Sequence, residues 1–315
     1  MHRNVTCKTT PVSRRTKDGT RVSAVAGAAY RAGENLKARG QGPDGSDKWF
    51  RYSNRSIVVR EAFILSPDGA PDYASDRSEL WNHVEEMETR KNARLGREVQ
   101  LGLAYELSHD EQRALVTEFA QREFVRRGFV ADIAIHNYGR TIPAMGASET
   151  QTARIREFAE IGLPFVERAE AQAMAEPHVL VMRDREGQAT GYKLYQPHAH
   201  IRVTPRTVEN GEWVSNKQAS RELNKHETAM NWRYDWAKLQ NAYLKRAGVE
   251  TRVRCTSDEE DALPDLPRRG KAENDITRTI EERAEQLTDE QRAAHEEAKA
   301  AEARDQEFRE VHNDT

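Results

Sequence analysis

Long apolar runs are missing from this 315-residue sequence. No stretch approaches the length that a membrane-spanning helix requires, and residues 1–6 contain no hydrophobic signal core. Apolar residues make up 37% of the chain and charged residues 32%, which allows only a modest core for this length. Cysteine is also scarce, since Cys7 and Cys255 cannot make a disulfide framework. We therefore expect a protein of the reducing cytoplasm that does not span a membrane.

The formal net charge of −3 conceals two regions of opposite sign. Residues 257–315 contain 19 Asp and Glu against 9 Lys and Arg, a balance of −10, which leaves +7 for residues 1–256. A basic body suits a phosphate backbone, whereas an acidic stretch is commonly solvated or contacts a partner. We expect one functional domain over 1–256 and an acidic tail, helical or partly disordered, over 257–315.

Two histidines separated by one small residue lie in a segment that is typical of a β-strand, Pro197-His198-Ala199-His200-Ile201-Arg202. Side chains alternate between the two faces of a strand, so His198 and His200 share one face and Ala199 and Ile201 share the other. Two imidazoles held side by side on a strand can bind a metal ion. The alternative is that both are half-buried polar residues, but the clean apolar back face favours the metal site.

A third ligand is available on another strand. Residues 129–136 place Asp132 and His136 opposite an apolar face, so His136 would join the pair if the two strands are neighbours. His178 is the rival third ligand. Three neutral imidazoles suit a divalent cation that acts as a Lewis acid, but they do not choose among Mg²⁺, Mn²⁺, Zn²⁺ and Ni²⁺.

A short helix rich in small residues is predicted at Ser23–Glu34, with Ser23 as the N-cap and Gly33 at the end. Tyr30 and Arg31 would occupy its last turn. A tyrosine beside an arginine is usually structural. A tyrosine hydroxyl can also act as a covalent nucleophile, and a metal site elsewhere in the fold could hold the phosphate that it attacks.

Periodicity predicts an α+β fold, a mainly antiparallel sheet covered by helices. Residues 35–55 are expected to form a loop, and an insertion at about 140–177 turns helical near 149–175. Ser108 and Glu111 form a predicted capping box. The expected strands lie at about 2–12, 56–65, 94–104, 129–136, 178–184 and 191–205, and the expected helices at about 22–33, 76–92, 109–128 and 218–247.

Other side chains are candidates for DNA contact. Arg202 and Arg206 lie on the histidine face by parity, which favours phosphate contacts for both. The aromatic residues Trp49, Phe50 and Tyr52, interleaved with Lys48, Arg51 and Arg55, could stack unpaired bases or form a hydrophobic lid over the sheet. Trp232, Trp236 and Tyr243 have the spacing of core-facing helix residues.

Four segments, taken in order, resemble the MobA/MobL family of plasmid relaxases, which are HUH endonucleases. They are Ser23–Glu34, Asp76–Glu85, Ala131–His136 and Pro197–Ile201. The resemblance covers about residues 1–256. One departure concerns spacing, because the first histidine and the His-x-His pair are close in the family, whereas here about sixty residues separate them.

The resemblance implies a relaxase that nicks one DNA strand at a transfer origin and becomes joined to its 5′ phosphate through a tyrosine. Tyr30 matches the family nucleophile, and His136, His198 and His200 match the metal triad, with Mg²⁺ or Mn²⁺ as the expected ion. Glu85 is expected to approach the tyrosine or the metal, and Arg31 to contact DNA. Implied partners are single-stranded DNA at the transfer origin, auxiliary relaxosome proteins and a type IV secretion coupling protein.

Three alternatives remain at this stage. A rolling-circle replication initiator would use the same chemistry on a different origin. A metalloenzyme with a histidine triad in a small-molecule pocket would leave the basic balance of 1–256 unexplained. A non-catalytic single-strand DNA-binding module would make Tyr30 structural.

Overall fold

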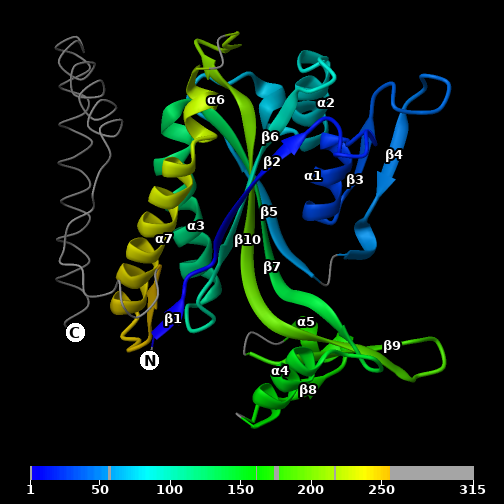
Figure 1. Cartoon of the computed structure of the whole chain (residues 1–315), viewed down its shortest axis with the longest axis vertical. Coiled ribbons are helices and arrows are strands. Elements are labelled where there is room, and N and C mark those ends of the chain that lie inside the picture. The colour runs from blue at the N-terminus through cyan, green and yellow to red at the C-terminus, as the bar shows by residue number, and fades with distance from the viewer. Residues whose placement is uncertain (1, 56–57, 161, 174–176, 216–217, 256–315) are drawn as a thin grey trace. The chain divides into compact units, whose positions relative to one another are not determined.

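The computed structural model in Figure 1 describes residues 2–55, 58–160, 162–173, 177–215 and 218–255. All of them lie within the first of the two compact units into which the chain divides, Met1–Ala262 and Leu263–Thr315. The expected acidic tail at 257–315 lies outside the described residues, so the predicted boundary near 256 stays a prediction.

A mainly antiparallel sheet forms the centre of the first unit, as predicted (Figure 1). Its strands follow the order β2, β6, β10, β7, β5, and each neighbouring pair is antiparallel. The five strands are β2 (Cys7–Ser13), β5 (Val59–Leu65), β6 (Arg94–Gly102), β7 (Phe129–Pro143) and β10 (Ala189–Glu209). The remaining strands are β1 (His2–Asn4), β3 (Asn35–Ala38), β4 (Lys48–Arg51), β8 (Phe165–Val166), β9 (Val179–Arg183), β11 (Glu212–Trp213) and β12 (Arg252–Arg254).

Helices cover both faces of this sheet. On one face, α3 (His109–Glu123) and α7 (His226–Arg246) pack against Ile133, Ile135 and Ile201 in the larger hydrophobic core. On the other, α1 (Ala24–Ala32) and α2 (Arg77–Met87) pack against a second cluster (Figure 1). Residues of alternate parity on β7 and β10 therefore face different helices.

The helices of the larger core begin and pack as their sequences indicate. The predicted capping box of α3 is confirmed, since the Ser108 side chain and the Glu111 carboxylate each accept from the other's backbone N–H. The predicted core positions Trp232 and Trp236 are buried, and each ring meets a phenylalanine edge-on, at centroid distances of 5.1 and 5.3 Å.

A smaller lobe extends from the sheet where β7 and β10 run on past the histidine positions (Figure 1). This distal lobe comprises residues 138–195 and includes β8, β9, α4 (Glu149–Glu160) and α5 (Arg168–Ala173). It has apolar clusters of its own, around Leu180 and around Ile142. The pairing of β7 with β10 is irregular between Lys193 and His198, at the junction of lobe and sheet.

Four expectations about elements are wrong. The single strand expected at about 2–12 is two strands, β1 and β2, which belong to different sheets. Residues 35–55 contain the antiparallel pair β3–β4, whose four-residue strands are too short to give a clear alternation around the Gly- and Asp-rich connection. The stretch 149–175 is broken between α4 and α5, where Gly162 adopts a positive φ of 77° and Pro164 follows. The long helix at 218–247 is two helices, α6 (Gln218–Leu223) and α7.

None of the helices in the described ranges has the length and apolar character needed to cross a membrane.

Candidate active site

The sheet brings three histidines together. His198 on β10 is directly opposite His136 on β7, and His200 lies two residues further along β10. The ring centroids are 4.8 to 5.2 Å apart, and one ligand atom from each ring lies within 4.8 Å of the other two. His178 is elsewhere, fully buried in the distal lobe, where its Nε2 is 2.6 Å from the hydroxyl oxygen of Tyr138. The geometry therefore groups His136, and not His178, with the pair.

Each of the three rings has one nitrogen engaged by an acceptor. His136 Nε2 lies 2.7 Å from the carbonyl oxygen of Arg31, and His198 Nδ1 lies 2.7 Å from that of Gln196. His200 Nδ1 lies 2.9 Å from a carboxylate oxygen of Glu98. A neutral imidazole that donates from one nitrogen presents a lone pair on the other, which is the arrangement found around metal-ligating histidines.

Burial keeps His198 neutral. The pKa of His198 is lowered to about 4, mainly by desolvation; the hydrogen bond to Gln196 opposes this shift, and the proximity of His200 adds to it. A metal ligand must be an unprotonated imidazole, so this environment suits the donor role. The set of three ring nitrogens therefore fits a divalent cation.

Glu98, on β6, is a site residue that the sequence analysis missed. Its carboxylate accepts from His200, pairs with Arg31, and lies 3.7 Å from the Arg202 guanidinium. It orients the ring of one candidate ligand and ties it to α1. A charged residue in the middle of a strand, next to the buried Val99, was the signal that could have identified it.

Tyr30 lies in the last turn of α1, as predicted. Ser23 caps the helix by accepting from the Ala26 N–H, and Gly33 ends it at a φ of 64°. The tyrosine side chain is 44% exposed, and its ring meets Tyr52 edge-on at 5.3 Å. The same helix end contacts the histidines, because the Arg31 carbonyl accepts from His136.

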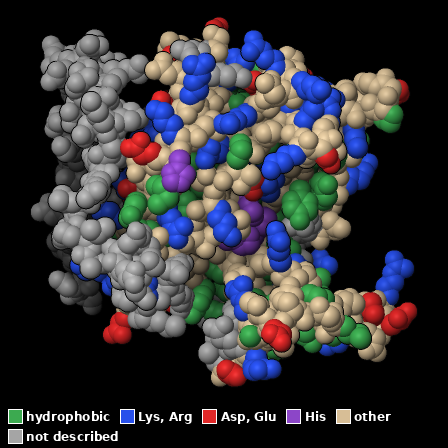
Figure 2. All heavy atoms as spheres, in the orientation of Figure 1, with side chains coloured by type: hydrophobic (Ala, Val, Ile, Leu, Met, Phe, Trp, Pro, Cys, Tyr) green, Lys and Arg blue, Asp and Glu red, His purple; other side chains and the backbone are tan. Residues whose placement is uncertain are grey.

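Tyr30 and the three histidines line one cavity of about 1270 Å³. This nucleophile cavity, as we call it, has no acidic side chain among the described residues that line it. Its charged residues are all basic: Lys8, Arg31, Arg140, Arg154 and Lys193. On the face shown in Figure 2, several Lys and Arg side chains (blue) lie beside histidine side chains (purple) near its centre. Such a cavity attracts a polyanion.

Glu85 is placed differently from the expectation that it approaches the tyrosine or the metal. Its carboxylate accepts from the hydroxyl of Ser23 at 3.0 Å and from the backbone N–H of Ala24 at 2.7 Å. These bonds hold it at the first turn of α1, whereas Tyr30 is in the last turn, and Glu85 is not among the residues that line the nucleophile cavity. Its observed role is to cap the helix.

Phosphate contact by Arg202 and Arg206 is not supported by their positions. Arg202 is 4% exposed and lies beneath α1, where it donates to the Ala24 carbonyl at 2.8 Å and its guanidinium carbon lies over the Trp81 ring, 5.3 Å from the ring centre. Arg206 donates to the buried Glu88 at 2.7 Å. Parity gave the correct face for Arg202, but α1 covers that face. The strand pairing is irregular after Val203, so parity does not extend to Arg206.

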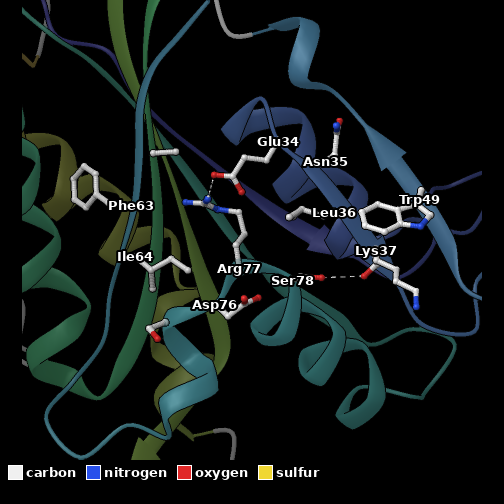
Figure 3. A pocket seen from close by; sticks show the side chains of 12 residues that line it. Glu34, Asn35, Leu36, Lys37, Trp49, Phe63, Ile64, Asp76, Arg77 and Ser78 are labelled. Atoms are coloured by element: carbon white, nitrogen blue, oxygen red, sulfur yellow. Dashed lines mark hydrogen bonds and ion pairs between the residues drawn. The ribbon is translucent and has the colours of Figure 1, made fainter.

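A second cavity of about 460 Å³ lies between the β3–β4 pair, β5 and the start of α2 (Figure 3). Its charges are largely satisfied internally, since Arg77 pairs with Glu34 and with Asp132. Of the expected aromatic set, Phe50 and Tyr52 pack inward against the smaller core. Trp49 is 51% exposed, with the Arg51 guanidinium 5.5 Å from the centre of its ring.

Several known proteins with similar sequences are named for mobilisation or conjugal transfer. A "Mobilization protein MobL" from Acidithiobacillus ferridurans is 33% identical over 36% of this chain and 28% of its own length. A "Conjugal transfer protein TraA" from Rhizobium radiobacter is 30% identical over 38% of this chain and 11% of its own length. The chain thus spans less than a third of the length of each of these relatives.

A solved structure and a family model complete the comparison. The structure, described as "Molecular Basis of Vancomycin Resistance Transfer in Staphylococcus aureus", matches 81% of this chain and all of that chain. Its TM-score of 0.54 at 23% identity shows a shared fold. The model of the MobA/MobL family matches residues 22–283, most of the sequence. On this match the chain belongs to the MobA/MobL family.

Proposed function

We propose that this chain is a relaxase, which nicks one strand of DNA at a transfer origin and becomes joined to the cut strand through Tyr30. The observation that carries the proposal is the nucleophile cavity, in which an exposed phenol and three clustered imidazoles share walls whose charged side chains are all basic. Family membership and the names of the relatives support the same assignment.

The chemistry that these groups would perform is a transesterification. The Tyr30 oxygen attacks the scissile phosphorus as the phenol loses its proton, the bond from phosphorus to the 3′ oxygen breaks, and that oxygen takes up a proton. The products are a 5′-phosphotyrosine and a free 3′-hydroxyl. One phosphodiester is exchanged for another, so the reverse reaction can rejoin the ends.

His136, His198 and His200 would hold a divalent cation, which when bound polarises the scissile phosphate and offsets charge that grows on its oxygens. Their donor set consists only of ring nitrogens. Mg²⁺ is bound mainly by oxygen ligands, so of the two ions expected from the family, Mn²⁺ fits this set better. Glu98 would keep the His200 ring in place through its bond to Nδ1.

The α1 helix would position the nucleophile. Its last turn carries Tyr30 at the cavity, and the Arg31 carbonyl joins that turn to the ring of His136. Arg31 also lines the cavity while its guanidinium pairs with Glu98. One peptide bond and one hydrogen bond therefore connect the residue that carries the attacking group with one of the histidines that would hold the cation.

The test is to incubate the purified protein with single-stranded oligonucleotides from the transfer origin of its own replicon, with and without Mn²⁺, and to detect a covalent adduct. Tyr30→Phe removes one oxygen atom and should abolish the adduct, whereas Tyr52→Phe, altered at the ring that contacts Tyr30, should retain it. An adduct that persists in Tyr30→Phe, or that maps to another tyrosine, would contradict the proposal. Cleavage of a replication origin instead would indicate an initiator, and tight binding without any cleavage would indicate a DNA-binding module.

A further inference from the structure

The distal lobe forms one wall of the nucleophile cavity. Arg140 comes from the outer part of β7, Arg154 from α4, and Lys193 from the start of β10. Lys193 pairs across the sheet with Thr141, the residue next to Arg140. Three of the five basic residues that line the cavity therefore belong to the segment that separates His136 from His198 in the sequence.

The two lobe arginines differ from those expected to contact DNA. Arg31 and Arg206 are each paired with a glutamate, and Arg202 is buried beneath α1. Arg140 and Arg154 are exposed, and among the side chains that the structure describes no acidic one forms a salt bridge with either of them. Exposed guanidinium groups at a cavity wall can donate hydrogen bonds to a phosphate without first breaking an ion pair.

The lobe also has the internal packing that a binding surface needs. Tyr138 and Tyr195 are buried together with Leu180, and burial raises the pKa of the Tyr138 phenol to about 12. Both tyrosines also line the cavity, but each is only 2% exposed, so the charge that this wall presents to a ligand comes from its cationic side chains. Such side chains bind the backbone of a nucleic acid and carry no direct sequence information.

We propose that the distal lobe is a backbone clamp, in which Arg140, Arg154 and Lys193 bind phosphates of the single strand beside the scissile phosphate. This inference rests on the proposed function, since it concerns the same strand in the same cavity. The sheet and α1 supply the reacting groups, and the lobe holds the adjoining stretch of the substrate on the wall that it forms.

The test measures how binding of a fluorescent oligo(dT) depends on salt, without metal and without cleavage. Each phosphate contact on a single strand contributes about 0.7 to the slope of log K against log salt concentration. The variant Arg140→Gln/Arg154→Gln/Lys193→Gln should bind more weakly at low salt, with a slope shallower by about 2. The single variant Arg154→Gln, at an exposed helix position where folding is not at risk, should lose about a third of that amount.

The matched control removes the same charge from the same lobe. Arg156, Arg168 and Arg185 are exposed and do not line the cavity, so Arg156→Gln/Arg168→Gln/Arg185→Gln should keep the wild-type slope. Two outcomes would overturn the clamp while leaving the proposed nicking activity intact. Either the salt slope falls equally in both triple variants, or it does not fall in the first. Failure of the wild-type protein to bind oligo(dT) would overturn the clamp, whereas the proposed function is decided separately, by the adduct assay on transfer-origin oligonucleotides.

Discussion

At the scale of single residues, the charge of Glu98 links the histidines to α1. Its carboxylate contacts His200, Arg31 and Arg202, and the Arg202 side chain is almost fully buried. Burial lowers the pKa of Arg202 to about 10, while the carboxylates of Asp132 and Glu85 oppose this shift, so its guanidinium remains charged at neutral pH. Removing one member of such a network leaves the others buried without compensation.

Glu98→Gln should lower the affinity for Mn²⁺ by about 10- to 100-fold, because the partner that orients His200 loses its charge. Isothermal titration of Mn²⁺ into the purified protein measures the change. Glu88→Gln is the matched control, since Glu88 is also buried and paired with an arginine but is not bonded to a candidate ligand. Similar losses in the two variants would show that the effect reflects general destabilisation and not orientation of the ring.

The sequence was sufficient for the residues that alternation places on a known strand face. His136, His198 and His200 are grouped as parity predicted, and Tyr30 occupies the expected last turn of α1. The sequence was insufficient where the position of a side chain depends on which helix packs over its face of the sheet or contacts it from elsewhere in the chain. Neither the burial of Arg202 under α1 nor the capping contact of Glu85 has a local signature, because each joins segments more than sixty residues apart.

At the scale of elements, α1 is fixed at both ends. Glu85 and Ser23 hold its N-terminus, and the bond from His136 to the Arg31 carbonyl holds its last turn. Between them, Gly27 permits a close approach to the sheet, since a Cβ there would lie 2.5 Å from a guanidinium nitrogen of Arg202. The position of the Tyr30 phenol therefore depends on contacts along the whole helix.

Glu85→Gln should act on this helix more than on the reaction. The amide keeps one acceptor oxygen but loses the charge at the helix N-terminus, so we expect the free energy of unfolding to fall by about 1 kcal/mol. Urea denaturation measures this loss. The rate of adduct formation at saturating oligonucleotide should fall less than tenfold. A fall of a hundredfold or more with stability unchanged would instead assign Glu85 a catalytic role.

At the scale of the whole molecule, charge is divided along the chain. The residues that line the nucleophile cavity carry basic charge only, whereas the last fifth of the sequence is strongly acidic. The overall pI of about 6.4 hides this division. Electrostatic binding to DNA depends on the local distribution of charge, so the acidic segment should oppose DNA binding when salt is low.

Shortening the chain tests this division in two steps. Ending it after residue 283, where the family match stops, removes a charge balance of −6, and ending it after residue 256 removes −10. Both chains should still form the adduct, because neither loses a residue that lines the nucleophile cavity. Their affinity for an oligonucleotide should rise in that order at low salt, and the differences should shrink as salt screens the charges. If the chain ending at 256 folds, as judged by circular dichroism, yet cannot cleave while the chain ending at 283 can, then residues 257–283 belong to the nicking domain and the boundary lies beyond 256.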